Sequence, residues 1–186
     1  EKLSEEEERK LLLWFYVAHM KGRYSYGSSE SYLDSDLSII NRTDSIDELL
    51  SSLKLYVKDY FVTAEELNGK SRRSPYFSLL FFMAKQNGVK DWFTVSEKLT
   101  GRAHALQFHH IFPKSLLRDL DHGRKEINDI ANLAFINGKT NRSISNKQPE
   151  EYFIDILKKR GDDALKGQYI SLEPGNWKLS NYDKFL

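Results

Sequence analysis

Apolar residues in the first half of the chain recur every three or four positions, a spacing that predicts helices. Ser4 followed by four glutamates predicts a helix start, because a hydroxyl accepts from free amides and carboxylates favour the positive end of the helix dipole. The apolar run from Leu11 to Met20 covers nearly all sides, so we expect that helix to be buried. Further helices are predicted over 30–40, from a cap at Asp44 or Ser45 to about Phe61, over 63–67 and over 75–86, where the apolar positions from Phe77 to Met83 should be core.

The pattern changes after Gly88. Leu106 to Phe112 is short, aromatic and β-branched, and Pro113 cannot continue a central strand, so we predict a strand over 106–112. A second apolar run, 130–136, ends at Asn137-Gly138, a strong turn signal. Short helices are predicted over 115–120, 139–147 and 150–159, with a turn at 121–123 and an aromatic C-terminal tail that packs back.

These elements predict a mainly α protein with a small α+β element. We expect an α-helical lead-in over residues 1–88. Over 89–186, a strand, a loop, a second strand and a helix should precede C-terminal helices. A chain of 186 residues suits one domain or two small ones, so the two regions could also form one compact unit.

Composition narrows the chemistry. The chain has no cysteine, which excludes disulfides and Cys-ligated zinc or iron, so any metal must bind His, Asn or carboxylate side chains. No stretch reaches the roughly 20 apolar residues of a membrane span, and the Glu-rich start does not resemble a signal peptide. A soluble cytoplasmic protein is therefore expected. The net charge of +1 does not by itself indicate a nucleic-acid binder, although 139–147 carries basic residues and no acid.

Two adjacent histidines carry the first candidate chemistry. Hydrolysis of a phosphodiester needs an activated water, a cation that neutralises the charge of the phosphorane, and stabilisation of the leaving oxygen. His109 and His110 lie on a predicted strand, so their side chains should project to opposite sides. They are therefore poor candidates for equivalent ligands of one ion. One imidazole on a metal and the other on water fits this geometry better, since imidazole is a base near neutral pH.

Two asparagines extend the candidate site. Asn132 begins the second predicted strand, and Asn141 follows nine residues later in the next helix. The amide oxygen of asparagine is a hard ligand that Mg²⁺ accepts. The predicted hairpin should bring both amides toward the histidine pair.

Together these residues resemble a nuclease signature. The segments His109-His110-Ile111-Phe112-Pro113, Ile130-Ala131-Asn132-Leu133 and Asn141-Arg142-Ser143-Ile144-Ser145-Asn146-Lys147 are similar to the His-Asn-His/Asn pattern of ββα-metal HNH nucleases. With Pro149 and Tyr152, they resemble more narrowly the nuclease half of GmrSD-type modification-dependent restriction enzymes and related phage-defence proteins. The signature spans 109–152, and a looser resemblance covers most of the chain, including 12–26.

The resemblance implies a role for each matched residue. His110 takes the position of the general base that activates water, and His109 that of a metal ligand, often Asp in relatives. Asn132 takes the position that steadies the loop carrying the base, and Asn141 that of a second metal ligand, His in many relatives. The implied cofactor is a divalent cation, Mg²⁺ first and Mn²⁺ second, which would keep several waters and take phosphate oxygens.

Three features depart from the family pattern. Many HNH domains bind a structural zinc through Cys pairs, which this chain lacks. Asn132 follows His110 by 22 positions, longer than in compact motifs, so Arg118 to Asp129 would be an inserted loop. GmrSD proteins also carry an N-terminal nucleotide-hydrolysing sensor domain, and nothing here resembles a phosphate-cradling loop. We therefore expect this domain elsewhere in the same polypeptide and the present chain to be a C-terminal fragment.

Each candidate residue also has a structural interpretation. The histidines could be half-buried strand residues bonded to backbone, Asn132 a turn amide and Asn141 a helix cap; their combination favours the site. Lys114, Arg142 and Lys147 are candidate phosphate contacts, with solvated surface charge as the alternative. Arg72-Arg73 could extend this footprint, although a linker is the simpler interpretation. His104 and His122 are expected in exposed loops and His19 in the first helix, outside any site.

The leading hypothesis is a metal-dependent DNA endonuclease that acts as the effector part of a restriction or phage-defence protein. The alternative is a DNA-binding or protein-interaction module without catalysis. A zinc hydrolase is poorly supported, because no third histidine ligand and no His-Glu-x-x-His pattern occurs. Metal-stimulated cleavage that depends on the histidine pair separates the first two hypotheses.

Overall fold

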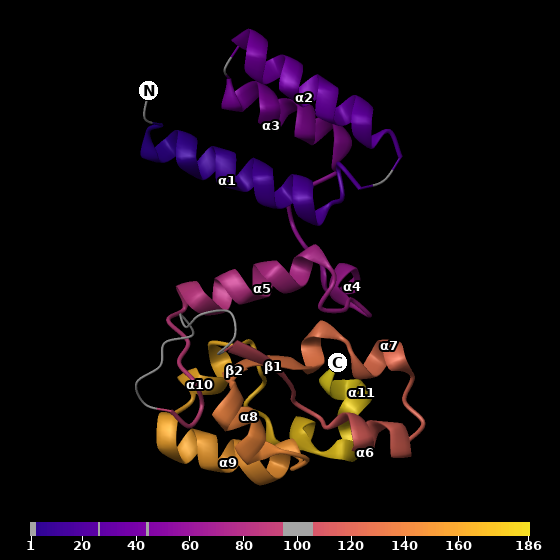
Figure 1. Ribbon diagram of the computed structural model, residues 1–186, viewed down its shortest axis with the longest axis vertical. Helices are drawn as coiled ribbons and strands as arrows, with labels where there is room; N and C mark the ends of the chain where they lie inside the picture. Colours follow the sequence, from indigo (N-terminus) through magenta and orange to yellow (C-terminus); the bar gives the residue numbers. More distant parts are fainter. Residues whose placement is uncertain (1–2, 26, 44, 95–105) are drawn as a thin grey trace. The chain divides into compact units, whose positions relative to one another are not determined.

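The computed structural model describes residues 3–25, 27–43, 45–94 and 106–186, and it divides into two compact units, Glu1–Thr63 and Ala64–Leu186 (Figure 1). The described residues are mostly helical with one two-stranded sheet, which confirms the predicted mainly α fold with a small β element. No helix among the described residues combines the length and the apolar character that a membrane crossing requires.

The first unit is built from three helices, α1 (Glu5–Met20), α2 (Ser29–Thr43) and α3 (Ile46–Tyr56). Both α1 and α2 pack against α3, and Figure 1 shows α2 and α3 running side by side. One face of each outer helix is enough to close this small core. The core contains Val17, Ala18, Leu53 and Val57.

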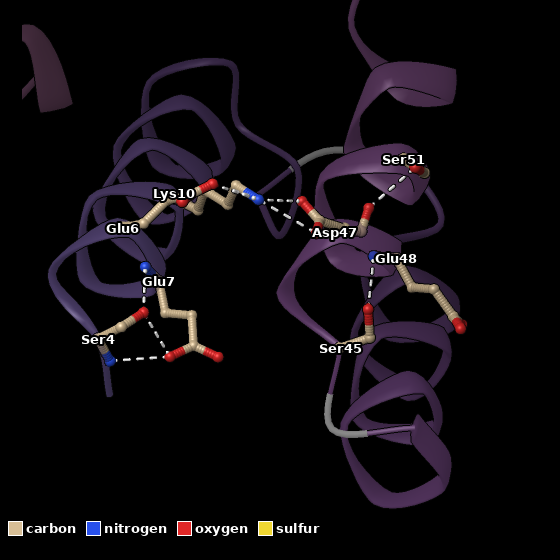
Figure 2. A network of polar contacts seen from close by, with 8 residues as sticks. All are labelled: Ser4, Glu6, Glu7, Lys10, Ser45, Asp47, Glu48 and Ser51. Atoms are coloured by element: carbon tan, nitrogen blue, oxygen red, sulfur yellow. Dashed lines mark hydrogen bonds and ion pairs between the residues drawn. The ribbon is translucent and has the colours of Figure 1, made fainter. Parts of the chain in front are cut away.

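Side-chain caps begin both α1 and α3, as Figure 2 shows. The Ser4 hydroxyl accepts from the Glu7 amide at 3.3 Å, and the Glu7 carboxylate accepts from the Ser4 amide at 2.8 Å, so the predicted capping is confirmed. The Ser45 hydroxyl caps α3 by accepting from the Glu48 amide at 3.3 Å; Asp44 lies outside the described residues. Lys10 then joins the two helices through an ion pair with Asp47 at 2.8 Å.

Two predictions about this unit were wrong. The third helix ends at Tyr56, not near Phe61, because Val57 takes extended backbone angles and turns its side chain into the core. The first helix is not buried all round, since a three-helix unit covers only one of its faces. Leu12, Leu13 and Phe15 are 52%, 42% and 54% exposed.

The second unit surrounds the sheet with short helices. Two strands, β1 (Leu106–His110) and β2 (Leu133–Asn137), pair antiparallel, and α8 (Gly138–Ile144) follows β2 directly and packs on both strands. The remaining elements are α4 (Ala64–Leu67), α5 (Pro75–Gln86), α6 (Lys114–Asp119), α7 (Arg124–Ile127), η1 (Ile130–Asn132), α9 (Pro149–Arg160), α10 (Asp163–Lys166), η2 (Pro174–Trp177), η3 (Leu179–Asn181) and α11 (Tyr182–Phe185).

The strand register separates the two histidines. Phe108 pairs with Phe135 and His109 with Ala134, so neighbouring positions on β1 face opposite sides. On one side, Phe77 of α5 contacts both phenylalanines, with ring centroids 4.8 and 5.3 Å apart. On the other side, small Ala134 leaves space for the aromatic groups around His109. The main core on that side contains Trp92, Ile136, Ile144, Tyr152, Phe153 and Ile156.

The aromatic face of α5 explains where the units divide. The sequence pattern placed the boundary after residue 88, whereas the compact units divide between residues 63 and 64. Helix α5 packs on the sheet through Phe77 and Phe81, so it lies with the second unit. The prediction that its apolar run is wholly core was wrong, because Phe82 is 44% exposed.

Several local predictions in the second unit also need correction. β1 ends at His110, two residues before the predicted end, and β2 begins only at Leu133 because residues 130–132 form a 3₁₀ turn. Asn137 is not part of a hairpin turn; it caps α8, its side-chain oxygen accepting from the Thr140 amide at 2.8 Å. The insertion contains helix α7 and is not a plain loop. Residues 95–105 lie outside the described residues.

A buried ion pair holds the first unit together. The Arg23 guanidinium donates two hydrogen bonds to Asp36, at 2.7 and 2.8 Å, and both side chains are only 2% exposed. The Ser52 and Tyr24 hydroxyls also donate to Asp36. Burial opposes the charge of Asp36, but these donors outweigh it and hold the pKa of the carboxyl below its ordinary value.

Asp36→Asn should therefore destabilise the first unit by about 3–5 kcal/mol, because it leaves the Arg23 charge buried without its partner. Since the pKa of Asp36 is lowered in the folded state, its stabilising effect is present at neutral pH and is lost as the pH falls below about 3.9. Urea unfolding monitored by amide exchange in α1–α3 measures both effects.

The matched control is Asp47→Asn, because Asp47 also forms an ion pair, with Lys10, but its side chain is 71% exposed. Exposed pairs contribute about 0–1 kcal/mol, so the control should change stability little. Equal losses in the two variants would contradict the role given to the buried pair.

Candidate functional site

His109 lies in the interior beside α8 and α9. It is 3% exposed, and its ring packs edge-on against Trp92 and Tyr152. Nδ1 lies 2.8 Å from Oδ1 of Asn141, and Nε2 lies 3.3 Å from the Tyr152 hydroxyl. Because Oδ1 only accepts, the neutral ring donates from Nδ1 to Asn141, and Nε2 is its unprotonated nitrogen; the Tyr152 hydroxyl beside Nε2 donates to the Ile111 carbonyl at 2.9 Å. Each ring nitrogen of His109 therefore has a defined neighbour.

The amide of Asn141 is oriented by a second contact. Its Nδ2 donates to Oε1 of Gln107 at 2.7 Å, which turns Oδ1 toward His109. Gln107 and His109 are two positions apart on β1 and therefore share a face of the sheet. Oδ1 of Asn141 and Nδ1 of His109 therefore face each other between α8 and β1.

Asp91 positions the helix that carries Asn141, a role that the sequence pattern did not indicate. Its carboxylate accepts from the Asn137 amide at 2.7 Å, from the Thr94 amide at 2.9 Å and from the Thr140 hydroxyl. Burial opposes the charge of Asp91, but these donors keep the pKa of the carboxyl below its ordinary value. A carboxylate fixed at the junction of β2 and α8 determines where the helix begins.

Asn132 fixes the loop after β1. It is 0% exposed; its Oδ1 accepts from the Phe112 amide at 2.8 Å, and its Nδ2 donates to the carbonyls of Phe112 and Ile127 at 3.3 and 3.0 Å. The side chain thus reaches backbone rather than the histidines. This geometry matches a residue that steadies a loop, and it does not place Asn132 among groups that could hold an ion.

His110 faces a different environment from His109. It lines a large open pocket, and its Nε2 lies 3.3 Å from Oδ1 of Asn128, whose own Nδ2 donates to the Arg124 carbonyl at 2.7 Å. Asn128 belongs to the inserted segment, and sequence reasoning did not select it. A side chain that follows a short unpredicted helix offers no local signal of a contact with His110.

Burial keeps both imidazoles neutral at pH 7. It lowers the pKa of His109 to about 4, against the Asn141 contact, which acts in the opposite direction. Burial also lowers the pKa of His110 to about 4, and the nearby charge of Lys114 adds to the effect. Each ring therefore presents a nitrogen lone pair, which either a cation or a proton can take.

The predicted phosphate contacts fall in different places. Lys114 lines the pocket beside His110, whereas Arg142 and Lys147 are exposed and do not line it. Arg72 and Arg73 do line it, so they are not simply part of a linker.

The remaining histidines lie outside the His109–Asn141 pair. The expectation of a fully exposed His122 was wrong: its side chain is 16% exposed and its ring packs on Tyr182. His19 is exposed in α1, as expected, and His104 is outside the described residues.

The donor set fits a hard divalent cation held by few protein ligands. Among the described residues, no cluster of three or more His, Cys, Asp or Glu side chains could hold a metal. His109 Nδ1 and Asn141 Oδ1 are 2.8 Å apart, and neighbouring ligands of an octahedral Mg²⁺ ion, each about 2.1 Å from the metal, are about 3 Å apart. A cation held by these two side chains alone would keep its other positions for water and substrate.

A family of known proteins matches the region that holds the candidate residues. Residues 53–182 match the family described as GmrSD restriction endonucleases, C-terminal domain. The match covers most of the chain and all of the candidate residues. The chain therefore belongs to this family of restriction-endonuclease domains.

A relative shows a similar region in a longer protein. An uncharacterized protein of Methanocaldococcus jannaschii is 28% identical over 183 residues, which cover 88% of this chain and 30% of that protein. The chain thus spans less than a third of the length of the curated relative that it matches. No solved structure matches the chain significantly.

Proposed function

We propose that this chain is the nuclease domain of a metal-dependent DNA endonuclease of the HNH type. The observation that carries the proposal is the pair formed by His109 Nδ1 and Asn141 Oδ1, 2.8 Å apart, with His110 on the opposite face of the same strand. The order β1, β2 and α8 is that of a ββα element, with α6 and α7 inserted between the strands. Membership of a restriction-endonuclease family supports the same activity.

His109 and Asn141 would hold the cation, Mg²⁺ first and Mn²⁺ second. Coordination through Nδ1 requires the ring proton on Nε2, and the Tyr152 hydroxyl is placed to accept it because that hydroxyl donates onward to Ile111. The Gln107 contact holds the amide oxygen toward the same point. A bound divalent cation supplies neutralisation of charge on the phosphorane and on the leaving oxygen.

His110 acts as the general base. When its Nε2–H donates to the Asn128 oxygen, Nδ1 carries the lone pair and takes a proton from the attacking water. Asn128 is a positioning residue in this scheme, because it sets the tautomer and the ring orientation. Asn132 contributes indirectly by holding the loop that follows β1.

DNA as the substrate and an effector role in restriction or phage defence belong to this proposal. A nucleotide-hydrolysing sensor domain in the same polypeptide and a cytoplasmic location also remain predictions. The alternative is a DNA-binding or protein-interaction module without catalysis. It predicts binding without metal-stimulated cleavage and indifference to substitution of His109, so cleavage assays distinguish the two.

His110→Ala should lower the rate of plasmid nicking in Mg²⁺ by about 100-fold or more, because general-base catalysis contributes about 10²–10⁴. The assay uses the purified chain with supercoiled plasmid, with EDTA as the metal-free arm. His19→Ala, which removes an exposed histidine of α1, should cut as the wild type does. Full nicking by the His110 variant would exclude it as the base.

Asn128→Ala should lower kcat about 10–100-fold with little change in KM, because the ring of His110 loses the acceptor that orients it. Asn128→Asp keeps an oxygen at this position and should restore most of the rate. Single-turnover cleavage over a range of DNA concentrations measures both constants. A loss confined to KM, or an equal loss in both variants, would contradict a positioning role.

A further inference from the structure

The pocket beside His110 is strongly basic. It encloses about 1240 Å³, and six lysine and arginine side chains line it, whereas none of the described residues that line it is acidic. The chain as a whole carries a net charge of only +1, so this concentration of charge is local. The cations of the lining are Arg72, Arg73, Lys114, Arg118, Arg124 and Lys125.

Two segments that are distant in sequence build the basic lining of this pocket. The loop before α5 is attached to η1: the Gly69 amide donates to Asp129 at 2.7 Å, and the Ile130 amide donates to the Lys70 carbonyl at 2.8 Å. Gly69 has a φ of +67°, and a Cβ there would lie 2.4 Å from a side-chain carbon of Lys125. The two hydrogen bonds hold the loop that carries Arg72 and Arg73 against the inserted segment.

The basic side chains that line the pocket repel one another. Burial lowers the pKa of Lys114, and the charges of Arg118, Arg72 and Arg124 lower it further. Among the described residues, no ion pair involves Lys114, Arg72, Arg118 or Arg124. Like charges gathered without acidic partners are unfavourable in the free protein, and a polyanion would relieve the repulsion.

We infer that Arg72, Arg118, Arg124 and Lys125 form a phosphate-binding wall that holds the backbone of the nucleic-acid strand whose scissile phosphate lies at His110. This inference deepens the proposed function and rests on it. It assigns substrate binding mainly to the inserted segment and the loop before α5, and not to the exposed Arg142 and Lys147. Because these side chains contact phosphates, the wall gives affinity without sequence preference.

The test measures how tightly the chain binds a DNA duplex of arbitrary sequence in EDTA. Binding is monitored by fluorescence anisotropy at salt concentrations from low to moderate. The wall variant replaces Arg72, Arg118, Arg124 and Lys125 together by Gln. Its Kd should rise at least ten-fold, and the slope of log K against log salt should decrease in magnitude by about 3.6, since each of the four lost phosphate contacts contributes roughly 0.9. Binding equal to that of the wild type would overturn the inference.

The matched control replaces four exposed lysines outside the pocket, Lys85, Lys158, Lys178 and Lys184, by Gln. It removes the same total charge and should change Kd less than three-fold. An equal loss in the control would show a general charge effect and overturn the inference. A third variant, Arg72→Lys, Arg118→Lys and Arg124→Lys, keeps the charge and should bind as the wild type does, and an unfolding midpoint of the Gln variant equal to that of the wild type excludes misfolding as the cause.

Length dependence separates a strand from a small anion. Affinity should rise steadily from a mononucleotide to a duplex of about 20 base pairs, since each added phosphate contact contributes. Tight mononucleotide binding without further gain would overturn the strand assignment. The proposed function fails separately: if His110→Ala binds and still cuts DNA, the base is wrong although the wall stands. If that variant stops cutting while the wall variant binds normally, the reverse holds.

Discussion

One buried amide, the side chain of Asn132, determines whether the candidate site can exist. It binds both the amide and the carbonyl of Phe112, which lies 20 residues earlier, and the carbonyl of Ile127. These contacts join the end of β1 to the start of β2, across the insertion that separates the strands. A lost partner for a buried polar group costs about 1–3 kcal/mol, so few other side chains could hold this loop. The directions of His109 and His110 follow from the strand that this amide terminates.

The pleat of β1 then separates two kinds of chemistry. His109 is buried against Trp92 and Tyr152, and its Nδ1 lies 2.8 Å from the side-chain oxygen of Asn141. His110 faces a basic pocket, where it meets the polar inserted segment. Under the proposed function, His109 would hold the cation and His110 would act as the general base, so the two rings would not compete for the same ligand. The basic wall extends this arrangement from the reacting group to the rest of the strand.

The resemblance implied the pairing of Asn141 with His109, and the expectation that Asn132 also approaches the histidines was wrong. Local patterns in the sequence predicted the helix starts and the alternation of His109 and His110. These features depend on neighbours in sequence or on the period of a strand. The roles of Asp91 and Asn128 were missed, because each contact joins segments that only the tertiary fold brings together. Asn137-Gly138 was misinterpreted since the same residues suit a hairpin turn and a helix cap. Whether His109 and Asn141 hold a cation remains a prediction.

The most direct test of that claim is binding of Mn²⁺ to the full chain, followed by electron paramagnetic resonance. If His109 and Asn141 hold the cation, one Mn²⁺ ion should bind, and its spectrum should show a nitrogen coupling from an imidazole. The coupling should disappear in His109→Ala, and Mn²⁺ affinity should fall at least ten-fold in both His109→Ala and Asn141→Ala, with Asn146→Ala as the unaffected control. Unchanged Mn²⁺ affinity in both site variants, or a nitrogen coupling that survives the loss of His109, would contradict that claim.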